Sequence, residues 1–170
     1  MGGGLVTTPL IDPQLDHNRA VRRLLQDHGS ANQYERWEAG LLPEHELLAL
    51  ARNLLFSPFR AFTRWAKLNT FDMQHDDSCS GGSPTYSTRE PRSLTHDEWA
   101  LFKSISDAVS RANSSGLLQR HGATASVSVV EHVGRCSVCS VETYGRAANI
   151  RIEWAGRPLS REYTLEGKQR

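Results

Sequence analysis

The sequence predicts an α+β protein: about four N-terminal helices, a long loop, one amphipathic helix, and a C-terminal antiparallel sheet of three or four strands. Two patterns support this fold class. Up to residue 68, and again from 95 to 113, apolar residues recur every three or four positions, as in amphipathic helices. From residue 124 onward they alternate with polar residues, as in half-buried strands. A chain of 170 residues can bury a core, and we expect one compact domain overall.

Charge and cysteine content limit the functional classes. The formal net charge of +1 has neither the basic excess of a duplex-DNA binder nor the acidic excess of a DNA mimic. Three cysteines, an odd number, indicate a reducing compartment rather than a secreted disulfide scaffold. The first residues lack the basic and apolar regions of a signal peptide, and no apolar stretch approaches a membrane span. We therefore expect a cytoplasmic protein without a membrane partner.

The helical part is expected over 12–68, after a flexible arm over 1–11. Asp12 as N-cap and Pro13 at the first helical position begin the first helix. Ser30 can cap a short second helix that Gly40 closes.

A third and a fourth helix complete this part. Pro43 opens the third helix, whose leucine-rich sequence predicts a central position. The fourth, from Phe59 to about Leu68, carries an aromatic stripe among cations. These cations are candidate binding residues together with one on the second helix: Arg60, Arg64, Lys67 and Arg36. The simpler interpretation is that the aromatics are core and the cations solvate the outer face.

A long loop over 69–93 separates the helical part from the C-terminal part, 94–170. The loop is rich in Ser, Gly and Asp, and Thr85 to Thr88 can add a short strand. Thr95 and Glu98 then form the pattern of a capping box. The helix that follows should cover the sheet with an apolar side made of Trp99, Phe102, Ile105 and Val109.

Three runs predict the strands, namely Thr124 to Val133, Ala147 to Trp154, and Leu159 to Leu165. A tight turn separates the last two runs, and its Gly156 can adopt a positive φ. A meander this small requires a helix on its apolar face.

A CxxC pair, Cys136 and Cys139, lies between the first two runs. Two thiolates at this spacing can bind one tetrahedral ion, as in a zinc knuckle. The remaining cysteine, Cys79, follows His75 by four residues in the long loop. These four residues could form a Cys3His site for one structural zinc that ties the loop to the sheet.

Other interpretations of the cysteines remain open. His132 and His121 are alternative fourth ligands. The cysteines could also be ordinary reduced thiols, or form a disulfide or redox pair. A thioredoxin-type motif is excluded, because it requires a helix after the CxxC and here a strand follows.

The stretch from Asn32 to Gly40, followed by Pro43 and the leucine-rich residues from Glu46 to Ala51, resembles part of a known DNA-binding fold. It is similar to the latter half of a Cro/cI-type helix-turn-helix repressor domain. In that family a recognition helix ends in an acidic-basic-Gly phrase, and a leucine-rich helix packs behind it. The resemblance implies a DNA-binding regulator that uses residues 31–56.

Catalytic motifs do not emerge from the sequence. Gly81-Gly82-Ser83-Pro84 lacks the Lys-Ser/Thr of a phosphate loop, and there is no Gly-x-Ser-x-Gly elbow. We therefore expect a non-enzymatic, macromolecule-binding accessory protein that contacts a protein partner, which could belong to a nucleoprotein complex. In its small size and arginine content it is similar to phage- and plasmid-type accessory proteins, including anti-CRISPR and antirestriction inhibitors. A DNA-binding regulator is the alternative.

Overall fold

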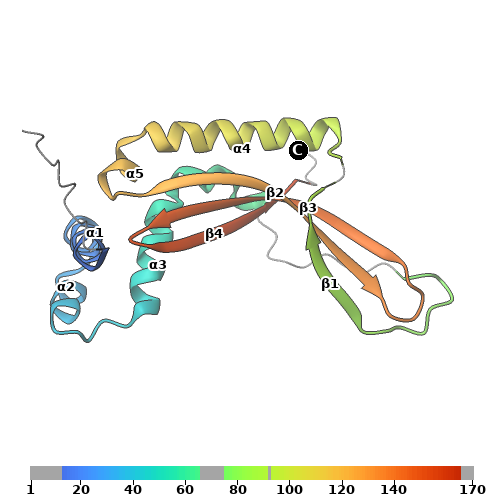
Figure 1. Cartoon of the computed structure of the whole chain (residues 1–170), viewed down its shortest axis with the longest axis horizontal. Helices are drawn as coiled ribbons and strands as arrows, with labels where there is room; N and C mark the ends of the chain where they lie inside the picture. The colour runs from blue at the N-terminus through green and yellow to red at the C-terminus, as the bar shows by residue number, and fades with distance from the viewer. Residues whose placement is uncertain (1–12, 66–74, 92, 166–170) are drawn as a thin grey trace, which may run out of the picture.

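The computed structural model describes residues 13–65, 75–91 and 93–165, and it has the expected α+β architecture (Figure 1). The expected arm, Asp12 and Lys67 lie outside these residues, as do the side chains of residues 63–65. The helices are α1 (Pro13–His28), α2 (Ala31–Glu38), α3 (Glu44–Leu55), the 3-10 helix η1 (Ser57–Trp65), α4 (His96–Ser114) and α5 (Gly116–Arg120). The strands are β1 (Pro84–Arg89), β2 (Thr124–Cys136), β3 (Glu142–Trp154) and β4 (Arg157–Thr164).

The four strands form one antiparallel sheet in the order β1-β2-β3-β4. The loop does supply the fourth strand, since β1 pairs with the end of β2 from Pro84↔Cys136 to Arg89↔Glu131. β2 and β3 have 13 residues each and are longer than their alternation predicted. Gly134 and Gly145 lie in the added segments, where they interrupt the apolar pattern on which the prediction depended.

One face of the sheet forms the core. The largest fully buried side chains on this face come from β3 and β4, and they include Ile150, Ile152, Trp154, Leu159 and Tyr163. Their spacing of two residues confirms the predicted alternation. The opposite face presents polar residues such as Ser126, Arg151 and Ser160, which are exposed.

α4 runs along the sheet and covers its core face, as expected (Figure 1). Ile105 and Val109 are buried, but Trp99 is 55% exposed, so its expected place in the core was wrong. The cap also differs from a complete capping box. Thr95 Oγ1 accepts from the Glu98 backbone N–H at 3.2 Å, whereas the Glu98 carboxylate binds Arg146 of β3.

The N-terminal helices pack at the end of the sheet that carries β4. Ser30 and Gln33 form a reciprocal capping box on α2. His17 of α1 lies with its Nδ1 2.8 Å from the carbonyl oxygen of Ala155, in the turn between β3 and β4. Leu47, Ala51 and Leu55 place α3 in the core, which agrees with its expected central position.

η1 and α5 differ from expectation. The expected fourth α-helix is a 3-10 helix as far as Trp65, and its Phe59 is fully buried. The five-residue α5 was not predicted, because Gly116 precedes too few apolar residues to give a period.

The outer half of the sheet extends beyond the helices (Figure 1). We call this part the β-projection: β1 together with residues 131–146, which are the outer ends of β2 and β3 and the turn between them. A row of opposite charges crosses its base. Glu131 receives hydrogen bonds from Arg89 (Nε–Oε2 2.5 Å) and Arg146 (Nη1–Oε1 3.1 Å), and Arg146 also binds Glu98 through two nitrogens. Among the described helices, none is long and apolar enough to cross a membrane.

Candidate metal centre

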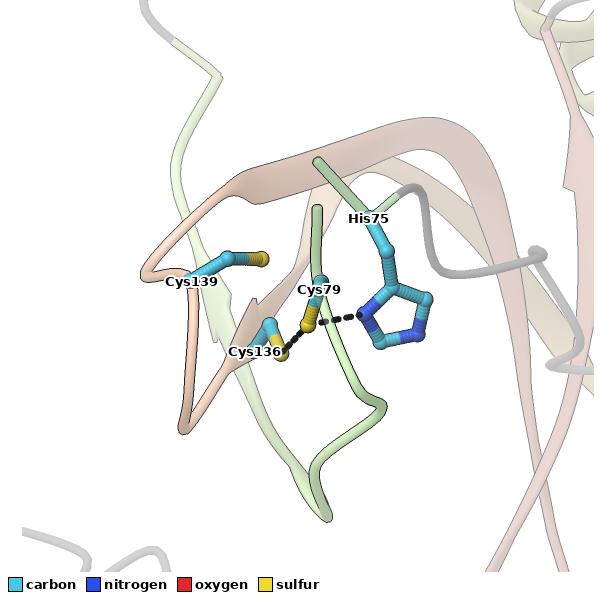
Figure 2. Close-up of side chains that lie close together, drawn as sticks. All are labelled: His75, Cys79, Cys136 and Cys139. Carbon is cyan, nitrogen blue, oxygen red and sulfur yellow. Dashed lines mark hydrogen bonds between the residues drawn. The ribbon is translucent and has the colours of Figure 1, made fainter. Parts of the chain in front are cut away.

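The fold brings together the four residues that the sequence predicted as metal ligands. Cys136 ends β2 and Cys139 lies in the turn to β3, while His75 and Cys79 lie in the segment before β1. One ligand atom from each residue lies within 4.8 Å of those of the other three. The side chains point toward a common centre at the tip of the β-projection (Figure 2).

The measured separations suit a tetrahedral ion. Cys79 Sγ lies 3.8 Å from Cys136 Sγ and 3.6 Å from His75 Nδ1. Four ligands at ordinary zinc bond lengths would place two sulfurs about 3.8 Å apart, and a sulfur and a nitrogen about 3.6 Å apart. The two separations from Cys79 Sγ therefore match those of a tetrahedral zinc site, and the remaining ligand atoms lie within 4.8 Å of one another.

The turn of the CxxC stabilises a thiolate. The backbone N–H groups of Cys139 and Val138 donate to Cys136 Sγ and lower the pKa of that thiol to about 6. The backbone N–H of Gly81 acts in the same direction on Cys79 (N–Sγ 3.4 Å), but burial and the neighbouring cysteines raise the pKa of Cys79 overall. At neutral pH one ligand is therefore already deprotonated, which is the form that binds metal.

Local turns hold both halves of the centre. The amide of Ser140 donates to the Cys136 carbonyl at 3.1 Å, and Ser140 adopts a φ of 58°. In the loop, the Cys79 amide donates to the Asp76 carbonyl at 2.8 Å.

Gly82 lets the two halves approach. A Cβ atom at this position would lie 2.5 Å from Ser137 Oγ and 2.7 Å from Val138 Cγ2, closer than such contacts allow. The loop therefore packs directly on the CxxC turn.

The alternative ligands lie elsewhere. His132 Nε2 is 2.7 Å from Glu162 Oε2 on the polar face of the sheet. His121 follows α5, and its ring approaches Asp27 and His28 rather than the cysteines. Neither histidine belongs to the cysteine cluster.

The four candidate cations do not form one described surface. Arg36 makes a double hydrogen bond with Glu46 of α3 (3.1 and 3.0 Å), so its guanidinium is already engaged. Arg60 is exposed on η1, whereas the Arg64 side chain and Lys67 lie outside the described residues. Their role in binding stays a prediction.

A second group of polar residues was missed. Asp27, His28 and His121 lie together, and Arg120 binds both oxygens of Asp27 (2.6 and 3.1 Å). These contacts join residues 93 positions apart, for which the sequence carries no pairing signal.

Comparison with known proteins adds no relative: no protein-family model, curated protein or solved structure gives a significant match.

Proposed function

We propose that this protein is a non-enzymatic, macromolecule-binding protein, in which a structural zinc fixes the β-projection in the form that a partner protein contacts. The observation that carries this proposal is the convergence of four ligand atoms within 4.8 Å from two segments separated in sequence. An inhibitor that blocks a surface of its partner, the class expected from the sequence, falls within this proposal.

Zinc is the metal that the donor set favours. Three sulfurs and one imidazole nitrogen in tetrahedral arrangement are typical of structural zinc sites, whereas magnesium and calcium prefer oxygen ligands. Four protein ligands would leave no open position for a substrate. This supports a structural role rather than a catalytic one.

The β-projection exposes large apolar side chains that the core does not use. Tyr86, Val138 and Tyr144 are 62%, 56% and 49% exposed. Exposed aromatic side chains contribute strongly to protein interfaces, because they bury much area at little entropic cost. A zinc at the tip would hold them in fixed positions, which lowers the entropic cost of binding.

Charges at the base of the β-projection support a non-enzymatic role. Glu98 and Glu131 are buried, but each carboxylate is bound by arginine. Burial acts to raise the pKa of Glu131, but the hydrogen bonds from Arg89 and Arg146 lower it overall, which makes this carboxyl a poor general acid.

The DNA-binding alternative has less support at the predicted element. Arg36, which would be its basic contact, is bound to Glu46. Freeing its guanidinium for DNA requires the loss of that double hydrogen bond.

Metal content tests the zinc. We expect wild-type protein and Ser137→Ala, a matched control in the same turn, to bind one zinc per chain by elemental analysis. Cys136→Ser should lose the ion and melt at a lower temperature, because the loop is no longer tied to β2. The proposal would be contradicted if wild-type protein refolded with zinc contained none of the metal. It would also be contradicted if Cys136→Ser kept one zinc per chain.

Site-specific crosslinking tests the partner. A photoreactive residue at Tyr144 or Val138 should give one discrete protein adduct in the source cells, and Cys136→Ser should abolish it. The same residue at Ser160, exposed on β4, serves as the control. Equal crosslinking from Ser160, or adducts with nucleic acid only, would reject the β-projection as a protein-binding surface.

A further inference from the structure

α1 lies at the end of the molecule opposite the β-projection (Figure 1), and three arginines form a cationic stripe along it. Arg19, Arg22 and Arg23 are exposed, while the neighbouring Val21 and Leu24 are buried. Because residues three and four apart share a helix face, the three guanidinium groups emerge on the same side of α1.

These arginines line a hollow of about 470 Å³ between α1 and the end of α5. Arg120 and His121 contribute the opposite wall. Arg23 Nη1 donates to the Arg120 carbonyl at 3.0 Å, which fixes one arginine of α1 against α5. We call this site the α1–α5 hollow.

Positive charge predominates in the α1–α5 hollow. Asp27 is bound through both oxygens by Arg120. Asp16 lies 4.0 Å from Arg19, with both side chains more than half exposed, and such pairs neutralise little. Arg22 contacts the ring of Trp37 at 5.9 Å, a contact that leaves its charge intact. The α1–α5 hollow thus retains the charge of the three arginines of α1.

A buried histidine below them lacks hydrogen-bond partners. The His121 residue is 1% exposed, and neither ring nitrogen has a hydrogen-bond partner among the described residues. The nearest carboxylate oxygen, Asp27 Oδ2, lies 3.8 Å from Nε2, too far for a hydrogen bond. Buried polar atoms are nearly always paired, so the unpaired ring of His121 in the wall of the α1–α5 hollow is an exception that needs an explanation.

The charge selects the kind of ligand. Asp27, His28 and His121 place their ligand atoms within 4.8 Å and resemble a metal site in composition. However, a cation there would have to displace Arg120 from Asp27 and would face the arginines of α1. An anion meets no such competition.

We propose that the α1–α5 hollow binds phosphate groups of a nucleic-acid backbone. Arginine pairs with phosphate through two parallel hydrogen bonds and is the residue best suited to it. The three arginines of α1 extend over slightly more than one turn, about 6 Å along the helix axis, and Arg120 adds a fourth at the end of α5, which suits successive phosphates better than a single ion. Backbone contacts carry no base information, so binding should be independent of sequence. This activity goes beyond the protein-binding role proposed above.

Salt-dependent binding tests the proposal. We would measure fluorescence anisotropy of labelled duplex and single-stranded oligonucleotides with the wild-type protein at several salt concentrations. Three neutralised phosphates predict a slope of log K against log salt of about −2 to −3. Arg22→Gln/Arg23→Gln should reduce affinity at least tenfold and lower the magnitude of the slope by about 2.

Three further experiments make the test decisive. Arg151→Gln removes an exposed arginine of the polar sheet face and should bind as wild type. Arg19→Gln is a second test variant: among the described residues Arg19 has an ion pair only with Asp16, and its side chain is 72% exposed, so weaker binding would reflect the lost charge rather than lost packing. Titration of Cys136→Ser with inorganic phosphate and with zinc shows whether the α1–α5 hollow binds a free anion or a metal cation instead of a nucleic acid.

Four outcomes would overturn the proposal. One is the absence of salt-dependent nucleic-acid binding. Another is unchanged affinity in both arginine variants. The third is stoichiometric zinc in Cys136→Ser that His28→Ala removes, since this would show a cation site. Binding of inorganic phosphate alone, with no oligonucleotide bound, would equally reject a nucleic-acid ligand.

Discussion

Gly82 shows how much the metal centre depends on a single missing side chain. One of its two α-hydrogens faces the CxxC turn, where a Cβ would also lie 3.2 Å from the amide nitrogen of Val138. That amide donates to Cys136 Sγ, so a displaced turn would weaken a bond that stabilises the thiolate.

Gly82→Ala should therefore lower zinc affinity about tenfold, the equivalent of about 1.4 kcal/mol. Competition with a chromophoric chelator measures this affinity. Gly116→Ala is the control, because a Cβ there meets nothing within 4 Å. Wild-type affinity in Gly82→Ala would mean that the loop does not pack on the turn.

Glu131 links stability to acid pH. Burial acts to raise the pKa of its carboxyl, but hydrogen bonds from Arg89 and Arg146 outweigh burial and hold the pKa below 4.5. A depressed carboxyl pKa contributes stability that is present above pH 4.5 and is lost as the pH falls through the folded-state value.

Glu131→Gln should destabilise the protein by about 2 kcal/mol at pH 7, since it weakens hydrogen bonds to two charged partners. The difference from wild type should shrink below pH 4.5. Urea unfolding at pH 7, 5 and 3.5 measures both. A pH-independent difference would show that the loss arises from packing rather than charge.

At the scale of the element, the turn between β3 and β4 is under strain. Ala155 and Gly156 form its two central residues, with φ of 51° and 72°. Glycine tolerates this left-handed conformation, whereas alanine has a higher conformational energy in it because of its Cβ atom.

Ala155→Asn should raise the melting temperature, because Asn-Gly is the preferred pair in such two-residue turns. A gain of about 1 kcal/mol is expected. Ala155→Val is the matched opposite, since a β-branched side chain is least tolerated at positive φ. If wild type and the two variants had the same melting temperature, this would argue against strain at this turn.

Elements with a strong local signal were predictable. Ser30, Pro13 and Thr95 mark helix beginnings through chemistry that acts within one turn, and alternation placed the buried residues of β3 and β4. Where tertiary contacts decide, prediction failed. The Glu98 side chain binds Arg146 instead of completing the capping box, and Trp99 is exposed rather than part of the apolar core.

The candidate metal centre was predictable from residue types, whereas the α1–α5 hollow was not. The three cysteines fix most of the ligand set, and His75 was predicted as the fourth ligand from its position four residues before Cys79, with His132 and His121 as alternatives. Arg120 and Asp27 are ordinary surface residues whose pairing depends on how α5 meets α1. No periodicity reports such a contact.

At the scale of the whole molecule, two parts of the sheet are stabilised by different interactions. Helices cover the sheet around β4, whereas the β-projection depends on its own pairing, the charge row and the metal centre (Figure 1). Removal of the proposed zinc should therefore loosen the β-projection before the part of the sheet that the helices cover.

Hydrogen exchange after zinc chelation tests this division. Amides of β1 and of residues 131–136 and 142–146 should lose protection, while those of β4 and α4 keep it. Cys136→Ser without chelator should show the same pattern. Uniform loss of protection would indicate that zinc stabilises the molecule as one unit.

The pairing of β1 with β2 has a consequence for solubility. The loop that carries His75 and Cys79 leads directly into β1, so the same ion that would bind those residues also keeps β1 against the outer edge of β2. If β1 left, the backbone amides and carbonyls of residues 131–136 would form an open edge that a second chain could extend. A bound zinc would then reduce edge-to-edge aggregation, because it keeps β1 paired with β2. Oxidants or chelators that remove the ion would expose the edge of β2 to pairing with a strand of another molecule.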